Sequence, residues 1–274
     1  MQLARYTPAC ASERNGPVSF ALLQAVPDAA WASFVFSEPA LPPMPPAEIQ
    51  QNWCGNSGVA LAVHSAGFYT IVKAAYARYG TGALGDARVL DFGCGWGRLA
   101  RLFIRDVPPE RLCGCDPDDR ILEWCQGIPG AFRVSEAKPT TLPFEEPFDL
   151  VYAFSVFTHL GPQTHLSALA ALHSSMRPGG LLIATIRPES FIDTAEFAFV
   201  TGDATRESLH TSYAAGEYLF GGYNLPKVHG EVPYGETVIP RQYIERHWAD
   251  RFEVLSALPY EVDPYQIPLA LRRR

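Results

Sequence analysis

The sequence lacks the features that mark several common classes of protein. Basic residues are in the minority, with 22 Lys and Arg against 29 Asp and Glu and a formal net charge of −7. Binding to nucleic acid needs clustered Lys and Arg, so this balance argues against such a partner. No apolar stretch at the N-terminus predicts a signal peptide, and no apolar run approaches the roughly 20 residues that span a bilayer. We therefore expect a cytoplasmic protein without a membrane partner.

Cysteine is present, but not in a metal-binding pattern. No CxxC pair and no matching histidine spacing occurs among the six cysteines, Cys10, Cys54, Cys94, Cys113, Cys115 and Cys125. We expect no metal site and reduced, buried thiols. Cys113 and Cys115 alternate along an expected strand, so their side chains should point to the same face of a sheet.

Strands and helices are expected to alternate from residue 88 onward. Short apolar strands are predicted at 88–92, 111–115, 131–134, 148–154 and 181–186, with helices at 97–106, 118–126 and 163–176. A helix at 240–250 and strands at 252–258 and 265–272 complete the series. Apolar strands separated by helices are typical of a parallel sheet covered on both faces. The fold expected is α/β: a doubly wound, Rossmann-like, seven-stranded sheet, mostly parallel, with a final antiparallel strand.

Two segments lie outside this alternation. Residues 1–52 read as irregular, and the proline-rich run 39–46 excludes helix and central strand there. Residues 57–79 then predict a helix that ends at Gly80. Residues 188–238 are rich in Gly, Tyr and Phe and weakly periodic, and they follow a strand that should end at the binding face of the sheet. They are therefore predicted to be an insertion over that face.

A glycine-rich loop follows the first expected strand. Gly93, Gly95 and Gly97 stand at alternate positions and run directly into a helix. Such glycines let the backbone turn tightly and approach a ligand, and the C-terminal ends of parallel strands are where ligands bind. A dinucleotide fingerprint would need the third glycine one residue later, where Arg98 stands. Asp91 would repel a pyrophosphate but could pair with an ammonium group, which favours S-adenosylmethionine (SAM) over NAD.

A second acidic residue supports this interpretation. Asp116 ends the second expected strand, about two dozen residues after the start of the glycine loop, where an acidic side chain accepts hydrogen bonds from ribose hydroxyls in this kind of fold. The alternative is that Asp116 caps the helix that follows Pro117, although Asp118 or Asp119 could also do so.

Four segments together resemble bacterial class I SAM-dependent methyltransferases. They are DFGCGWGRL (91–99), GCDPDDRILEWC (114–125), LPFEEPFDLVYAFSVFTHL (142–160) and MRPGGLLIAT (176–185). The resemblance is closer to the branch with a SVFTHL segment after the fourth strand, and it extends from WCGNSG to the closing strand. The first 50 residues and the insertion lie outside this resemblance. From the order of elements, we expect an N-terminal extension and lid helix at 1–85 and a SAM-binding domain at 86–274, with the insertion 188–238 covering the acceptor.

The resemblance also implies which residues bind SAM. It assigns the methionine part of SAM to Asp91, Gly93, Gly95 and Gly97, the ribose to Asp116, the flank of the adenine to 137–139 with Lys138, and the side of the sulfonium to Ser155. Cys94 and Pro117, beside these residues, are further predicted cofactor-binding residues. Two departures from the family pattern stand out. Lys138 replaces an acidic residue near the adenine amine, and Gln266-Ile267 replaces a Gln-Asp pair in the last strand.

The acceptor must be aligned with the methyl group, and a hydroxyl or ammonium acceptor must also lose a proton. His159 is the best candidate base because it follows the fourth strand at the binding face, although it could instead cap a helix or hold the loop. His229 and Glu231 in the insertion are further candidates. Arg187 could bind an acidic acceptor or pair with Glu189. The aromatic residues of the insertion could either line the wall of the acceptor pocket or belong to the core. They are Tyr213, Tyr218, Phe220, Tyr223 and Tyr234.

The function expected is methyl transfer from SAM to an oxygen, and less readily to a nitrogen, of a small molecule. The resemblance suggests a sugar or a natural-product intermediate as the acceptor. Two alternatives stay open: a catalytically inactive SAM-binding protein that serves a partner enzyme, and an NAD-dependent dehydrogenase.

Overall fold

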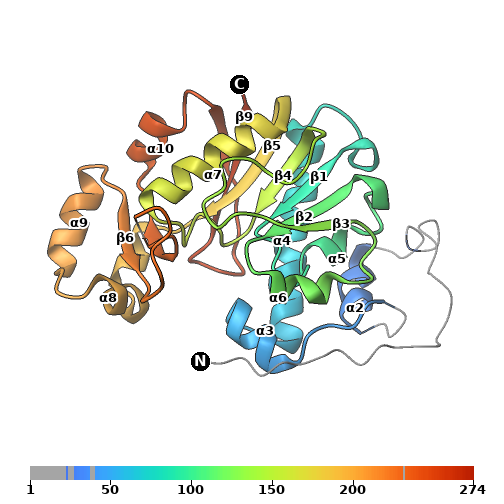
Figure 1. The fold of residues 1–274 in the computed structure, drawn as a ribbon, viewed down its shortest axis with the longest axis horizontal. Coiled ribbons are helices and arrows are strands. Elements are labelled where there is room, and N and C mark those ends of the chain that lie inside the picture. Colours follow the sequence, from blue (N-terminus) through green and yellow to red (C-terminus); the bar gives the residue numbers. More distant parts are fainter. Residues whose placement is uncertain (1–22, 24–27, 38–40, 231) are drawn as a thin grey trace.

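A seven-stranded sheet forms the centre of the protein, in a computed structural model that describes residues 23, 28–37, 41–230 and 232–274 (Figure 1). The strand order is β3-β2-β1-β4-β5-β9-β8. The bounds are β1 (Val89–Phe92), β2 (Leu112–Asp116), β3 (Ala131–Val134), β4 (Phe148–Ala153), β5 (Met176–Ile186), β8 (Phe252–Ala257) and β9 (Ile267–Arg273). Strand β9 runs antiparallel to both of its neighbours, whereas β3, β2, β1, β4 and β5 pair in parallel. The predicted fold class is confirmed.

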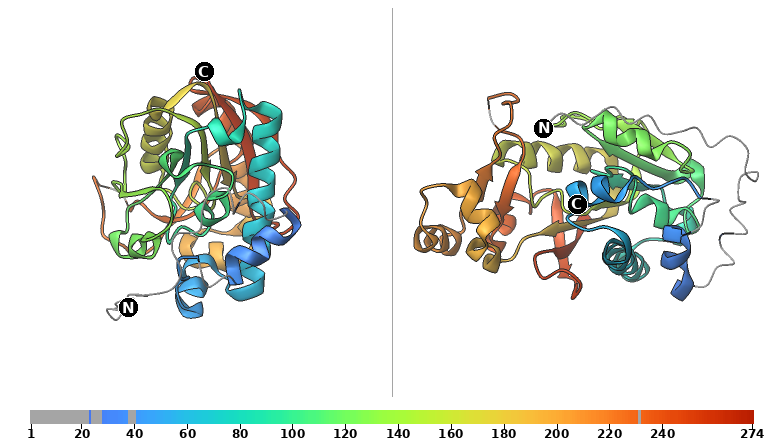
Figure 2. Two further views of the ribbon diagram at one scale, coloured as in Figure 1. Left: turned by 90° about the vertical axis from the view of Figure 1, so that its right-hand side faces the viewer. Right: turned by 90° about the horizontal axis from the view of Figure 1, so that it is seen from below.

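Helices cover both faces of this sheet (Figures 1 and 2). On one face, α4 (Gly58–Tyr79) and α5 (Ala100–Phe103) pack in a core cluster that includes Val89 of β1. On the other, α7 (Pro162–Ser175) and α10 (Arg241–His247) pack in a cluster with Leu90 of β1. Every residue of β1 and β2 is buried, which explains why these strands are apolar apart from Asp91 and Asp116. Cys113 and Cys115 belong to the same cluster, so their predicted common face is confirmed.

Several elements differ in length from the prediction. Helix α5 has four residues, and the next helix divides into α6 (Asp119–Leu122) and the 3-10 turn η3 (Glu123–Cys125). Strand β5 begins at Met176, before the expected turn, and its pairing with β4 shifts register between Phe148 and Leu150. Local periodicity identified these elements, but their ends depend on neighbours that the local sequence does not reveal.

The region before the sheet is partly helical, so the irregular reading of 1–52 was wrong for two described segments. Helices α2 (Asp28–Ser37) and α3 (Ala47–Cys54) form there. Trp31 on α2 is fully buried and its Nε1 donates a hydrogen bond to the Leu102 carbonyl over 2.7 Å. Contacts with the sheet domain therefore stabilise α2, and no local pattern predicts them. The prolines at 42–46 lie before or between helices, while residues 38–40 fall outside the described part.

Helix α4 matches its predicted span and has Gly80 at its C-terminal cap. By length and composition alone it could cross a membrane, and no other helix in the described part meets that test. Phe68 and Val72 on α4 are fully buried against the sheet, as expected of a core helix.

The insertion has regular structure of its own despite its weak periodicity. It contains the 3-10 turn η4 (Glu189–Asp193), α8 (Ala195–Thr201), α9 (Arg206–Ala214) and a hairpin of β6 (Leu219–Gly222) and β7 (Gly235–Val238). A small cluster of Phe191, Ile192, Phe197, Leu219 and Val238 joins these elements. In Figures 1 and 2 they form a lobe at the opposite end of the molecule from α2.

Candidate active site

The ends of several strands meet at one edge of the sheet. Gly93, Asp116, Ser155 and Arg187 follow or end the parallel strands β1, β2, β4 and β5. Gln266 precedes β9, which runs the other way and therefore starts at the same edge. Its Nε2 donates to the Ser155 hydroxyl over 3.0 Å. The polar side chains predicted from separate strands are thus brought together.

The glycine loop has the backbone that its sequence predicted. Gly93, Gly95 and Gly97 have φ values of 74°, 52° and 75°, in the left-handed region that favours glycine. A Cβ atom on Gly95 would lie 2.6 Å from Nε1 of Trp53, a residue of α3. The loop therefore needs glycine for its conformation and for the close approach of α3.

Asp116 connects the glycine loop to the end of β2. Its Oδ2 accepts a hydrogen bond from the Gly95 N–H over 2.9 Å, and its Oδ1 accepts one from the Asp118 N–H over 3.0 Å. The cap of α6 is Asp118, whose side chain accepts from the Arg120 N–H, so the capping alternative for Asp116 is not needed. Burial raises the pKa of Asp116 above its usual value. Each carboxylate oxygen has a second lone pair and can still accept from a ribose hydroxyl.

Asp91 is the second buried carboxyl group at this edge. Only 3% of its surface is exposed, and its Oδ2 accepts from the Ala100 N–H over 3.2 Å. Burial raises the pKa of Asp91 to about 7, against the lowering effect of the nearby Arg98 charge. Two carboxyl groups beside a glycine loop fit the ammonium and ribose hydroxyls of SAM, and they suit a pyrophosphate poorly. The residues present therefore fit SAM.

The other predicted SAM-binding residues occupy different settings. Cys94 is buried, with its Sγ 3.7 Å from the Gly95 carbonyl oxygen. Pro117 is exposed directly after β2, and Lys138 is half-buried in the connection from β3 to β4. Their contacts with the cofactor stay predictions.

His159 lies at the centre of a hydrogen-bonded group after β4. Its Nδ1 is 2.7 Å from the Gly235 carbonyl oxygen, which can only accept, so Nδ1 carries the proton of the neutral ring. Its Nε2 is then the accepting nitrogen, 3.3 Å from the Ser155 hydroxyl and 3.4 Å from Nη2 of Arg187. The ring stacks on Tyr234 with centroids 4.9 Å apart. The accepting nitrogen of His159 thus lies beside a hydroxyl group.

Glu236 on β7 completes this group, and the sequence did not single it out. It is fully buried, and it accepts hydrogen bonds from Arg187 and from the Tyr223 hydroxyl. Its Oε1 lies 3.3 Å from Nδ1 of His159. Burial alone would raise the pKa of Glu236, but the hydrogen bond from His159 and the charges of His159 and Arg187 lower it below its usual value. Glu236 is therefore ionised near neutral pH.

Arg187 pairs with Glu236 across the insertion, so the expected pair with Glu189 was wrong. Glu189 instead lies 2.9 Å from Nδ1 of His210. Nearness in sequence suggested the first partner, whereas the fold supplies one 49 residues away.

The β6–β7 hairpin docks on the segment that carries His159. The Gly235 N–H donates to the His159 carbonyl over 2.8 Å, and the Thr237 N–H donates to the Thr158 carbonyl over 2.9 Å. This pairing brings Tyr234, as well as Glu236, next to the imidazole.

The remaining candidates in the insertion lie elsewhere. Tyr218 stacks on the buried His165, and Tyr213 packs against the core of the insertion. Half-buried Phe220 lies on β6. His229 lies in the exposed turn of the hairpin, and none of the hydrogen bonds to His159 within the described residues comes from it. The candidate base Glu231 lies outside the described residues.

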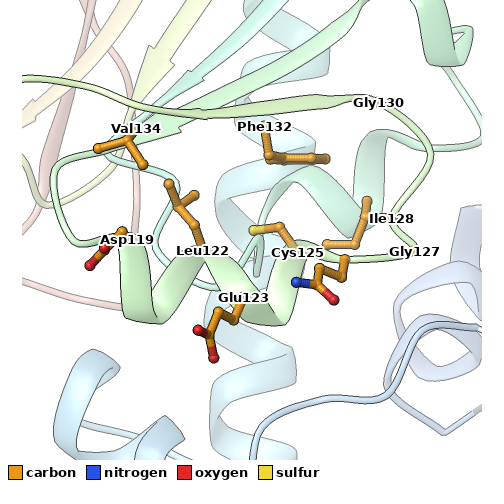
Figure 3. A pocket seen from close by; sticks show the side chains of 10 residues that line it. Asp119, Leu122, Glu123, Cys125, Gly127, Ile128, Gly130, Phe132 and Val134 are labelled. Atoms are coloured by element: carbon orange, nitrogen blue, oxygen red, sulfur yellow. The ribbon is translucent and has the colours of Figure 1, made fainter. Parts of the chain in front are cut away.

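A cavity of about 390 Å³ lies apart from these groups, between the α6–η3 segment and β3 (Figure 3). Leu122, Cys125, Phe132 and Val134 line it, and neither the three glycines nor His159 does. It belongs to the edge of the sheet beside β3.

The chain resembles known methyltransferases in sequence and in fold. Residues 89–180 match the family described as "Methyltransferase domain". Trans-aconitate 2-methyltransferase of Rhizobium rhizogenes is 34% identical over 96 residues, which are 35% of this chain and 36% of that protein, so this chain spans about a third of the length of the curated relatives it matches.

Two solved structures share the fold. A SAM-dependent methyltransferase of Clostridium acetobutylicum is 12% identical with a TM-score of 0.54, over 83% of this chain and 97% of that one. Magnesium protoporphyrin IX methyltransferase of Synechocystis with bound SAM is 13% identical with a TM-score of 0.51, over 91% and 99%. The resemblance found in the motifs is confirmed: residues 89–180 carry a methyltransferase domain, and the fold is that of class I SAM-dependent methyltransferases.

Proposed function

We propose that the protein transfers the methyl group of SAM to a hydroxyl oxygen of a small molecule, with His159 as the general base. The observation that carries this proposal is the orientation of the imidazole. The Gly235 carbonyl holds the proton on Nδ1, so the lone pair of Nε2 points to a site where a hydroxyl, that of Ser155, lies 3.3 Å away. A base must be within hydrogen-bond reach of the proton it removes, and this nitrogen lies at the ligand-binding edge of the sheet.

The reaction divides between the cofactor and the protein. SAM, when bound, supplies a methyl group on a positively charged sulfur, which keeps the electron pair of the broken carbon–sulfur bond. Asp91 and Asp116 would hold its ammonium and ribose beside the glycine loop. His159 takes the acceptor proton at Nε2 as the acceptor oxygen forms its bond to the methyl carbon. The imidazolium afterwards loses this proton to water.

The charges around His159 support a hydroxyl acceptor over a carboxylate. A carboxylate acceptor would need a free cation to bind it, and Arg187 is already paired with the buried Glu236. A hydroxyl needs a base at neutral pH, which a carboxylate does not. This argument separates the protein from its trans-aconitate-methylating relative. A sugar or a natural-product intermediate is the class of acceptor that the sequence resemblance favours.

The first test is SAM binding and turnover on a panel of hydroxyl compounds. SAM should stabilise the protein against heat, and NAD at the same concentration should not. With an acceptor in hand, His159→Ala should lower turnover about 10²–10⁴-fold while SAM affinity stays nearly unchanged. The loss should shrink at high pH, where the acceptor ionises without help.

A histidine outside the group serves as the control. His229→Ala changes a residue in the exposed hairpin turn and should keep full turnover. Full activity in a stable His159→Ala variant would refute the role of His159. Equal stabilisation by NAD would refute the choice of cofactor, and SAM binding without turnover on any acceptor would point to an inactive SAM-binding protein.

A further inference from the structure

We propose that Glu236 is the positioning residue for His159: its carboxylate holds the ring through Nδ1 and stabilises the imidazolium that forms when Nε2 takes a proton. This inference rests on the proposed function, in which His159 is the base. Glu236 itself does not touch the acceptor.

The position of Glu236 is fixed from several sides. Its side chain is fully buried, Arg187 donates to Oε2, and the Tyr223 hydroxyl donates to Oε1. A buried carboxylate without donors would take up a proton, so these contacts keep it charged. The charge remains 3.3 Å from Nδ1 of His159.

The carbonyl of Gly235 and the carboxylate of Glu236 contribute differently at Nδ1. The carbonyl oxygen is the nearer acceptor, at 2.7 Å, and fixes which nitrogen carries the proton. A neutral carbonyl offsets little of the positive charge of an imidazolium, whereas a carboxylate beside the same nitrogen does so directly. The Gly235 carbonyl thus fixes the tautomer of His159, and the Glu236 carboxylate supplies the negative charge that stabilises the imidazolium.

The other charged groups near the ring make Glu236 necessary. Nη2 of Arg187 is 3.4 Å from Nε2, and its positive charge opposes protonation there. Glu196 on α8 faces Glu236. Burial, together with the Glu236 charge, raises the pKa of Glu196. The phenol of Tyr223 is neutral near pH 7 because burial and Glu236, through a hydrogen bond and its charge, raise the pKa of Tyr223. Without the Glu236 charge, Arg187 would lose its ion-pair partner, and Glu196 would be left to offset the positive charge beside His159.

The test follows the ring nitrogens of His159 by ¹⁵N NMR against pH, in the whole protein with S-adenosylhomocysteine added. The seven histidines are separated by comparison with the spectrum of His159→Ala. In Glu236→Gln, the protonation midpoint of His159 should lie about 1–3 pH units below that of the unaltered protein. Turnover on a hydroxyl acceptor should fall on the order of 10²-fold or more, with SAM affinity retained.

Two further variants make the result decisive. Glu236→Asp keeps the charge but shortens the side chain by one methylene, which withdraws the carboxylate from Nδ1. Both the shift of the midpoint and the loss of turnover should therefore be smaller than in Glu236→Gln. Glu189→Gln removes an exposed carboxylate from the same insertion and should change neither measurement. If Glu236→Gln does not fold, the Asp variant decides alone.

An unchanged midpoint in the folded Glu236 variants would overturn this inference and leave His159 as the base. Full turnover in His159→Ala would instead refute the base itself. The two failures are therefore distinguishable.

Discussion

The Gly95 N–H donates a hydrogen bond to Oδ2 of Asp116 over 2.9 Å, which joins the glycine loop after β1 to the end of β2. The carboxylate expected to bind the ribose thus also holds the loop expected to bind the methionine part. A change at Asp116 should act on both halves of the cofactor site.

Asp116→Ala should weaken SAM binding by about 1.5–3 kcal/mol, the range for hydrogen bonds to a charged group. It should also lower the unfolding temperature, because the N–H groups of Gly95 and Asp118 lose their acceptor. Asp116→Asn keeps one oxygen acceptor, so its losses of SAM affinity and of thermal stability should both be smaller. Calorimetry and thermal unfolding measure the two effects. Unchanged affinity in the folded Ala variant would mean that Asp116 holds the loop and does not bind SAM.

SAM affinity should increase with pH through neutrality. Burial raises the pKa of Asp91 to about 7, and only the ionised carboxylate attracts the SAM ammonium. Affinity should therefore rise between about pH 6 and about pH 8, with protons released on binding. Isothermal calorimetry in buffers of different ionisation enthalpy measures this release. Asp91→Asn should remove the pH dependence, and a dependence that persists in it would assign the titration to another group.

The same raised pKa predicts how the unliganded protein responds to pH. Asp91 in the folded state holds its proton to a higher pH than in the unfolded chain, so its contribution to stability is present at acid pH and is lost as pH rises through about 7. The free energy of unfolding of the protein should therefore fall, relative to that of Asp91→Asn, as pH rises from about 4 to about 7. Urea unfolding at a series of pH values tests it, and parallel curves would contradict it.

Gly95→Ala should weaken SAM binding and lower the unfolding temperature. The new Cβ would lie 2.6 Å from Nε1 of Trp53, and a φ of 52° is strained for alanine. The conformational part should cost about 1–2 kcal/mol. Gly55→Ala is the matched control, since Gly55 has a φ of 68° but open space around its Cβ position.

The contact with Trp53 can be separated from the strain. A second substitution, Trp53→Ala, removes the clash and should restore part of the stability that Gly95→Ala loses. A double variant no more stable than Gly95→Ala would show that the strain alone accounts for the loss.

His210 should stabilise the insertion at low pH. Its Nδ1 lies 2.9 Å from Glu189 and its Nε2 lies 3.2 Å from Asp193, so the doubly protonated ring can donate to both carboxylates. Hydrogen bonds to Glu189 and then Asp193 raise the pKa of His210. The stabilisation is therefore complete below the unfolded pKa and is lost as pH rises through the folded one. Hydrogen exchange of α9 should be faster in His210→Ala than in the unaltered protein under acid conditions, and similar in both under alkaline conditions.

The strands and the glycine loop could be predicted because their causes are local. A strand buried on both faces is mostly apolar, as β1 and β2 are apart from Asp91 and Asp116. The left-handed backbone at Gly93 and Gly97 favours glycine, which the sequence shows directly. Asp116 was found by its distance along the chain from that loop.

Glu236 and α2 could not be found in this way because their causes are distant in sequence. Glu236 stands on a short strand in a weakly periodic segment, and it acquires its setting only when β7 pairs with residues 158–161. Helix α2 depends on the burial of Trp31 against Leu102, 71 residues away. Even Arg187, which the sequence did single out, takes a partner that only the folded insertion brings near.

The position of β9 between β5 and β8 also bears on how the chain folds as it is made. Strand β5 leaves the ribosome well before β9, which follows it by roughly 80 residues, or about 4–16 s at ordinary rates of synthesis. During that interval, the backbone groups of β5 that later pair with Leu269 and Leu271 have no partner in the sheet. A nascent chain of this length exposes a long apolar strand edge, which is where chaperone binding or misassembly during translation should concentrate.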